Sequence, residues 1–210
     1  MKNLFLKLIY FVIAILLFVS GCLPTNVTSL KDPSYNNIIF RRILVIADFQ
    51  KIEEMKEFES EMANEFKENG TFAVENHRVL PPIREYTYDE KVAVYKKYNL
   101  DGYILISPQG FQTATVYVPD VEKKKTTTTK DSNTISRETT TAVYPGGEMR
   151  VPTQFDAQIK FVDLMNGKVV WQSETETKLN KDSRMSEIFS SVCSNVVKQL
   201  KVDGVIKNNP

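Results

Sequence analysis

The chain of 210 residues has very few of the residues from which metal sites and disulfide frameworks are built. His77 is its single histidine, so a site that binds a metal through several histidines is excluded. Cys22 and Cys193 are its two cysteines, too few for a fold that depends on a disulfide framework. We therefore expect an ordinary hydrophobic core to hold the fold together.

An excess of charge of one sign is also missing. The 27 basic residues are balanced by 26 acidic ones, and removal of residues 1–21 takes away Lys2 and Lys7 and leaves 25 basic residues. Nucleic-acid-binding domains usually carry a clear basic excess. We therefore expect no nucleic acid among the partners of this protein.

One apolar run of twelve residues, 8–19, lies close to the N-terminus. It is shorter than the ~20 residues that a membrane-spanning helix needs, and the small residues Ser20 and Gly21 separate it from Cys22. A charged start, a short apolar run and small residues are typical of a secretory signal peptide, here residues 1–21. Residues 19–22 resemble the lipobox of bacterial lipoproteins, which implies cleavage before Cys22 and a diacylglycerol group on its sulfur.

The same resemblance implies that the protein binds a lipid bilayer and indicates which membrane this is. An acylated N-terminus with two or more chains is held stably in a lipid bilayer. Leu23 stands where Gram-negative lipoproteins of the inner membrane carry Asp, which favours the periplasmic face of the outer membrane. The alternative locations are the outer face of the cytoplasmic membrane and the cell surface. The alternatives to lipidation are an uncleaved membrane anchor and a signal peptide without a lipid.

Residues 22–40 are polar, contain prolines and asparagines and show no sustained apolar period, which predicts a lipidated tether. Residues 41–202 are long enough for one hydrophobic core and are predicted to form a single domain. Residues 203–210 are predicted to be a C-terminal tail.

The domain is predicted to begin with a βαβαβ unit. Residues 41–49 form a short β-branched run, and residues 71–79 and 103–107 are further strand candidates. Apolar residues recur at helical spacing in residues 52–69 and 87–99. Strands that alternate with helices favour a parallel arrangement with right-handed crossovers.

The second half of the domain has a different pattern. Residues 155–162 and 168–177 alternate on either side of Asn166-Gly167, the strongest short-range signal for a β-hairpin. An apolar helical stripe then runs from Met185 to Leu200. The predicted fold class is therefore α/β with α+β elements: a single mixed sheet with a βαβαβ start, a C-terminal hairpin and a closing amphipathic helix.

A Thr-rich insert, residues 119–152, interrupts this pattern. Its central part, residues 122–141, contains Lys123, Lys124 and Lys125 and almost no large apolar residue, so it cannot order itself as core. Threonine favours strands. Disorder and a protruding hairpin, which would continue the alternating residues 112–118, are therefore equal alternatives.

These segments together resemble a family of small, uncharacterised bacterial lipoproteins. In layout that family is similar to the N-terminal domain of TolB and to the periplasmic domains of curli-secretion and penicillin-binding-protein-activator lipoproteins. The family has no assigned catalytic residue, so the resemblance carries none to this chain. The segments that carry the resemblance are residues 41–48, 53–69, 77–82, 101–106, 162–164, 167–171 and the closing helix.

Two residues are candidates for chemistry. His77 would have to serve any histidine-based triad, but its place in a predicted alternating strand favours a half-exposed structural role. Asp48 ends the first strand, where ligands bind in open α/β sheets. A carboxylate that caps the next helix or is solvated is the favoured reading for Asp48. No catalytic, cofactor-binding or metal residue is therefore assigned.

Other residues have structural interpretations. Cys193 lies on the apolar stripe of the last helix and is expected to behave as a small hydrophobe. Trp171 is expected in the core or in a cross-strand pair, and the three lysines of the insert in a solvated loop. A tyrosine-rich neighbourhood is either a partner surface or, as we favour, the packing face of the second helix. Its members are Tyr86, Tyr88, Tyr95, Tyr98 and Tyr103.

The expected function is that of a membrane-anchored, non-enzymatic accessory or binding protein of the cell envelope, which docks to another envelope protein. One alternative is a cell-envelope hydrolase that uses Asp48 or His77. Another is a subunit of an oligomeric lipoprotein secretion or assembly complex, in which the Thr-rich strands pair between protomers.

Overall fold

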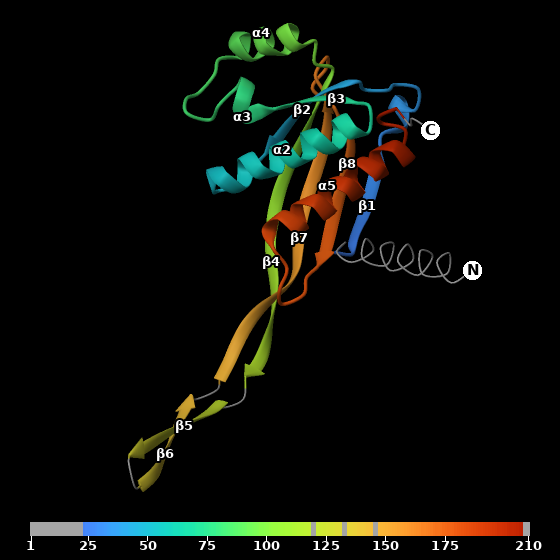
Figure 1. The fold of residues 1–210 in the computed structure, drawn as a ribbon. Helices are drawn as coiled ribbons and strands as arrows, with labels where there is room; N and C mark the ends of the chain where they lie inside the picture. Colours follow the sequence, from blue (N-terminus) through green and yellow to red (C-terminus); the bar gives the residue numbers. More distant parts are fainter. Residues whose placement is uncertain (1–22, 119–120, 132–133, 145–146, 208–210) are drawn as a thin grey trace, which may run out of the picture.

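The computed structural model describes residues 23–118, 121–131, 134–144 and 147–207, with side chains outside residues 118–146. Six strands form one mixed sheet, and helices cover it (Figure 1). The predicted fold class is therefore confirmed. In their order across the sheet the strands are β1 (Thr25–Lys31), β8 (Val169–Lys178), β7 (Gly147–Asp163), β4 (Gly102–Val118), β2 (Arg42–Ala47) and β3 (Phe72–Glu75).

The predicted βαβαβ unit is present. Strand β2 lies between β3 and β4 and is parallel to both. Helix α2 (Ile52–Glu68) connects β2 to β3, and the short α3 (Asn76–Val79) and α4 (Tyr88–Tyr98) lie between β3 and β4. Strand β4 is longer than predicted, because a bulge between Pro108 and Gly110 lets it continue into residues 112–118.

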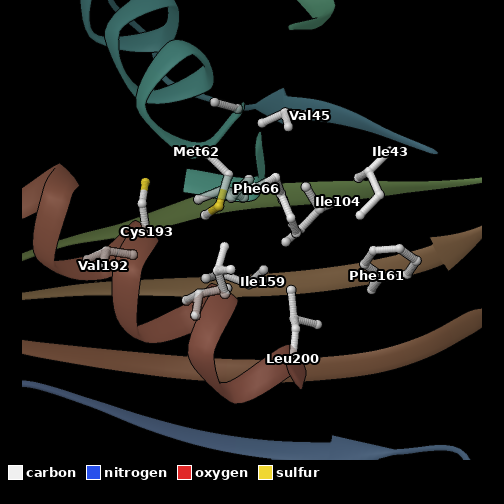
Figure 2. Packing of buried hydrophobic residues seen from close by; sticks show 14 of the residues in the cluster. Ile43, Val45, Met62, Phe66, Ile104, Ile159, Phe161, Val192, Cys193 and Leu200 are labelled. Atoms are coloured by element: carbon white, nitrogen blue, oxygen red, sulfur yellow. The ribbon is translucent and has the colours of Figure 1, made fainter. Parts of the chain in front are cut away.

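Helices α2 and α5 (Met185–Val202) pack side by side on one face of the sheet (Figure 1). Figure 2 shows Phe66 of α2 and Leu200 of α5 among the strand residues Ile104 and Ile159. All four side chains are fully buried. The predicted stripe of α5 is confirmed, because its 3.6-residue periodicity matches the face that lies on the sheet.

Gly102 is required where β4 begins. A Cβ atom at this position would lie 2.6 Å from the ring of Phe161, which itself packs against Phe40 at a ring-centroid distance of 4.8 Å. The missing side chain therefore allows two aromatic rings to fill the end of the core.

A two-stranded ribbon leaves the body at one end (Figure 1). Strands β4 and β7 stay paired from Ala114↔Val151 to Val118↔Gly147. This part lies outside the core, because Phe155 is the core residue of β7 nearest to the ribbon. The antiparallel pair β5 (Val121–Asp131) and β6 (Thr134–Tyr144) continues in the same direction. Of the two alternatives for the Thr-rich insert, the structure therefore has the protruding hairpin.

The predicted strand 71–79 is wrong in its second half. Strand β3 ends at Glu75, and residues 76–79 form α3 instead. The N–H of His77 donates to the carboxylate of Glu59 on α2, so the chain turns toward that helix rather than continuing in the sheet.

The predicted tether of residues 22–40 is also wrong. Thr25–Lys31 is strand β1, paired with β8 over its whole length, and Leu23, Tyr35 and Phe40 are buried. Polar side chains of this strand bond to α5: Ser29 donates to the carboxylate of Asp203, and Lys31 to its carbonyl oxygen. These polar contacts explain why the sequence shows no apolar alternation.

The predicted tail begins too early, because Val205 and Ile206 are buried and Ile206 forms a parallel bridge with Phe40. The signal peptide and the lipidation of Cys22 lie outside the described residues. Within the described part of the chain, no helix combines the length and the apolar character that crossing a bilayer would require.

Candidate functional site

A cavity of about 550 Å³ lies where β2 ends and the ribbon begins. Its size is in the range of small-molecule sites. The wall combines apolar with polar and charged side chains. Its lining residues include Asp48, Lys51, Gln109, Phe111, Phe155 and Met185. This is the position beyond a strand end that the sequence indicated for Asp48.

Asp48 is exposed at this cavity and does not cap a helix. Its backbone N–H donates to the carbonyl of Ile106 at 2.8 Å, which continues the β2–β4 pairing by one residue. The N-cap of α2 is Lys51, and no side chain hydrogen-bonds to the helix start there. The capping interpretation of Asp48 is therefore wrong, whereas the solvated carboxylate agrees with its exposure.

His77 is held by the buried carboxylate of Glu59. One oxygen of Glu59 accepts the N–H of Ala47 at 3.1 Å. The other accepts the N–H of His77 at 2.8 Å and lies 2.7 Å from its Nδ1. The side chain of His77 is only 12% exposed. Glu59 thus ties α2 to the end of β2 and the start of α3, and the expected structural role of His77 stands, although the residue is neither half-exposed nor in a strand.

His77 does not line the cavity at Asp48. A carboxylate on Nδ1 can orient a catalytic imidazole. A nucleophile would then have to bond to the ring, and among the hydrogen bonds of the described residues His77 has Glu59 as its side-chain partner. Within the described chain, no group of three or more carboxylate, thiol and imidazole side chains is placed to hold a metal ion.

Cys193 is completely buried on α5 (Figure 2). Burial raises the pKa of its thiol well above the ordinary value. A thiol in this state is a poor nucleophile. The residue therefore behaves as the small hydrophobe that its position on the stripe predicts. Trp171 is likewise buried in the core, and its ring N–H donates to Asp203 at 2.6 Å.

The opposite end of the body carries a different kind of surface. Helix α4 has no buried residue, and Tyr88 is 80% exposed. The favoured interpretation of the tyrosines as a packing face is therefore wrong for Tyr88. Ile83, in the loop before α4, is 85% exposed, and Met165, in the β7–β8 turn, is 88% exposed.

A groove of about 410 Å³ separates α4 from the β7–β8 turn. Figure 1 shows α4 at the end of the body away from the ribbon. We use the name distal surface for the apolar residues of this groove together with Ile83 in the loop before α4. The distal surface consists of Ile83, Tyr88, Val92, Tyr95, Leu164 and Met165. Met165 carried no sequence signal beyond an apolar residue beside an Asn-Gly turn.

The β7–β8 turn presents Met165 rigidly. The buried carboxylate of Asp163 accepts the N–H of Met165 at 2.8 Å, the side-chain amide of Asn166 at 2.8 Å and the hydroxyl of Tyr35 at 3.2 Å. Gly167 closes the turn with φ of 70°, a conformation that favours glycine. The exposed methionine therefore stands on an ordered support.

Helix α4 is fixed at its ends instead of through a buried face. Thr87 and Glu90 form a reciprocal capping box, and Arg84 contacts Glu90 at 2.9 Å. The Arg84 guanidinium and the N–H of Thr87 lower the pKa of Glu90 to about 2. Asn99 ends the helix in the left-handed conformation, with φ of 50°. The side chain of Arg42 on β2 donates to the carbonyl of Tyr98 at 2.7 Å and joins the end of the helix to the sheet.

The described fold has a counterpart among solved structures. No protein-family model and no curated protein matches the chain. A point variant of PelC from Paraburkholderia phytofirmans, described as a dodecamer, is 12% identical with a TM-score of 0.50, and the match covers 89% of this chain and 100% of that chain. A second crystal form of the PelC dodecamer is 11% identical with a TM-score of 0.49 and the same coverage. At these identities the likeness concerns the fold alone.

Proposed function

We propose that the protein is a non-enzymatic accessory lipoprotein of the bacterial cell envelope, anchored through Cys22 and bound to another envelope protein through the distal surface. It belongs, in this proposal, with the small lipoproteins that its sequence layout resembles. The address that follows from Leu23 is the periplasmic face of the outer membrane.

The observation that carries the proposal is the exposure of Tyr88 and Met165, each at least 80% exposed, in the lining of one groove. Single exposed apolar residues are ordinary, but an apolar group around a groove is typical of a protein-binding surface. The turn of Met165 and the ends of α4 are held by hydrogen bonds, so little ordering is needed on binding.

The charge around the groove specifies the partner. Helix α4 carries Lys91, Lys96 and Lys97 against Asp89 and Glu90, and Glu90 is already paired with Arg84. A segment with apolar side chains flanked by carboxylates would complement this surface. We therefore expect an acidic, apolar protein segment as the ligand.

In-cell photo-cross-linking tests the binding surface. A photoreactive residue at Tyr88 or at Met165 is expected to give one and the same abundant adduct. Leu30 is the matched control, because it is also 80% exposed and apolar but lies on β1. Adducts of equal yield and identity from Leu30 and from the distal surface, or none from Tyr88 and Met165, would refute the proposal.

The anchor has its own test. The substitution Cys22→Ala is expected to abolish the mass of the attached lipid and to release the protein from membranes. A wild-type protein without that added mass would contradict the anchoring part of the proposal. The cross-linking experiment would still test the distal surface independently.

A second candidate is a subunit of an oligomeric lipoprotein complex. It is favoured by the likeness in fold to PelC, which is described as a dodecamer, and by the ribbon, whose described strands β5 and β6 pair only with each other. Strand edges of this kind can pair with another chain. The mass of the lipidated protein in detergent, measured by light scattering, distinguishes a ring from a monomer.

A further inference from the structure

The lipidated end of the chain has almost no slack. Leu23 is 8% exposed, and its carbonyl accepts the hydroxyl of Ser191 at 2.6 Å. The next residue, Pro24, accepts the N–H of Lys178 through its carbonyl. The hydroxyl of Thr25 lies 2.7 Å from that of Ser191. The first three residues after Cys22 are therefore bonded to β8 or α5.

The length of free chain decides how the body can move. A flexible tether of eighteen residues would span roughly 23 Å. Here Cys22 is joined to the buried Leu23 by one peptide bond, which covalent geometry sets at about 3.8 Å between their Cα atoms. An acyl group on Cys22 thus lies next to the folded body, and the body cannot stand clear of the headgroups.

The register of the sheet shows which end is held. Thr25 pairs with Thr177, which pairs in turn with Phe155, so the anchor lies in the row of residues from which the ribbon departs. Figure 1 shows β1 beginning at this end of the body and α4 at the other end. The eight steps from Phe155 to Asp163 separate the two ends by about 27 Å along β7.

The surface at the anchored end combines exposed charges with an amphipathic ribbon. Lys178, Lys181 and Arg184 are exposed there beside the exposed acidic residues Glu176, Asp182 and Glu187. Basic side chains near an anchor are attracted to anionic headgroups. Within the ribbon, one side is apolar and the other is polar. Ala114 and Val116 pair with Val151 and Met149 on the apolar side, and Thr115 and Tyr117 pair with Arg150 and Glu148 on the polar side.

We infer that the bilayer surface is the docking partner of the anchored end: Cys22 holds the body flush on the headgroups, with the 178–184 loop and the apolar side of the ribbon against them. Val116 and Met149 are 44% and 51% exposed, and an amphipathic element of this kind binds at the headgroup boundary. The inference rests on the lipidation in the proposed function. It adds that the distal surface lies at the end of the body far from the anchor and the ribbon.

Fluorescence quenching on the purified lipidated protein tests the orientation. The buried Cys193 and the acylated Cys22 leave single surface cysteines free for labelling. A dye at Lys181→Cys or Met149→Cys, on vesicles of phosphatidylethanolamine and phosphatidylglycerol with a headgroup-level quencher lipid, is expected to lose most of its emission. Glu148→Cys, the next residue on the opposite side of the ribbon, is expected to lose much less, and Tyr88→Cys, at the far end of the body, less than Lys181→Cys.

A second protein restores the missing slack. A Gly-Ser segment of about twenty residues between Cys22 and Leu23, which spans about 25 Å, leaves every described residue unchanged. Quenching at Lys181→Cys is expected to fall several-fold in this protein, because the body then moves away from the headgroups.

The outcomes separate the two proposals. Absence of the lipid mass refutes the anchor and this inference together. A lipidated protein in which Lys181→Cys is quenched no more than Tyr88→Cys refutes the orientation alone. Equal quenching of Met149→Cys and Glu148→Cys would also overturn it. So would shielding of the Met149→Cys dye from solvent that appears only at high protein density and without quencher lipid, because a second copy of the protein then covers the ribbon.

Discussion

At the scale of single residues, the buried carboxylate of Glu59 joins three elements of the fold. It accepts the N–H groups of Ala47 and His77 from two different elements and contacts the His77 ring. A buried donor without an acceptor costs about 1–3 kcal/mol. The histidine that suggested chemistry is thus part of a structural junction, and the sequence could not show this because Glu59 looks like any charged helix residue.

Loss of this carboxylate should therefore destabilise the protein. We expect Glu59→Ala to lower the free energy of unfolding by about 3 kcal/mol, and Glu59→Gln by about half as much because the amide keeps one acceptor oxygen. Chemical denaturation followed by circular dichroism measures both values. Glu57→Ala, an exposed position on the same helix, is the control, and an equal loss there would contradict the assignment.

Burial of Cys193 predicts a thiol that does not react in the folded protein. The raised thiol pKa and the lack of access both suppress the thiolate at neutral pH. A maleimide should therefore modify Cys193 only at the rate of unfolding. Ser190→Cys, an exposed neighbour on α5, should react at once. Fast labelling of Cys193 without denaturant would show that α5 does not pack as described.

At the scale of secondary-structure elements, the sequence periodicity predicted that a helix or strand exists better than it predicted what that element packs against. Helices α2 and α5 followed from their apolar stripes because they pack on a sheet. The sequence predicted α4 too, but its stripe faces a groove instead of a core. Strand β1 was missed because hydroxyls replace apolar side chains at its contacts with α5, as at Thr25 and Ser29.

The ends of α4 give a pH prediction. The folded pKa of Glu90 is about 2, below its ordinary value of 4.5, so its stabilising effect is complete above pH 4.5 and is lost as the pH falls toward 2. An NMR titration of the Glu90 carboxyl should show the low midpoint. In Arg84→Gln the midpoint should rise toward 4.5, and a wild-type midpoint near 4.5 would contradict the pairing.

At the scale of the whole molecule, body and ribbon are separable. The last buried residue on the way into the ribbon is Phe155, whose ring packs against Phe111 at a centroid distance of 5.2 Å. The candidate surfaces lie at opposite ends of the body. Sequence alone could not place them there, because β1 is distant in the chain from the ribbon, and α4 is distant from the β7–β8 turn.

Removal of residues 114–151, with Asn-Gly as the new turn between Thr113 and Pro152, should therefore leave the body folded. We expect the free energy of unfolding to change by no more than about 1 kcal/mol, because none of the described side chains that are removed belongs to the core. Thermal denaturation measures this. Removal of residues 24–31, which form the N-terminal edge of the sheet, should lower the midpoint strongly, and the reverse ranking would refute this division.

The pairing of β1 with β8 also orders the biogenesis of the protein. Thr25 and Thr177 are 152 residues apart, so the first strand cannot dock until β8, close to the C-terminus, is available. Closing so long a loop comes late in folding. In the proposed lipoprotein, the enzymes that cleave and acylate at Cys22 would therefore act before β1 docks, while Leu23 is not yet buried. Maturation would then precede completion of the sheet.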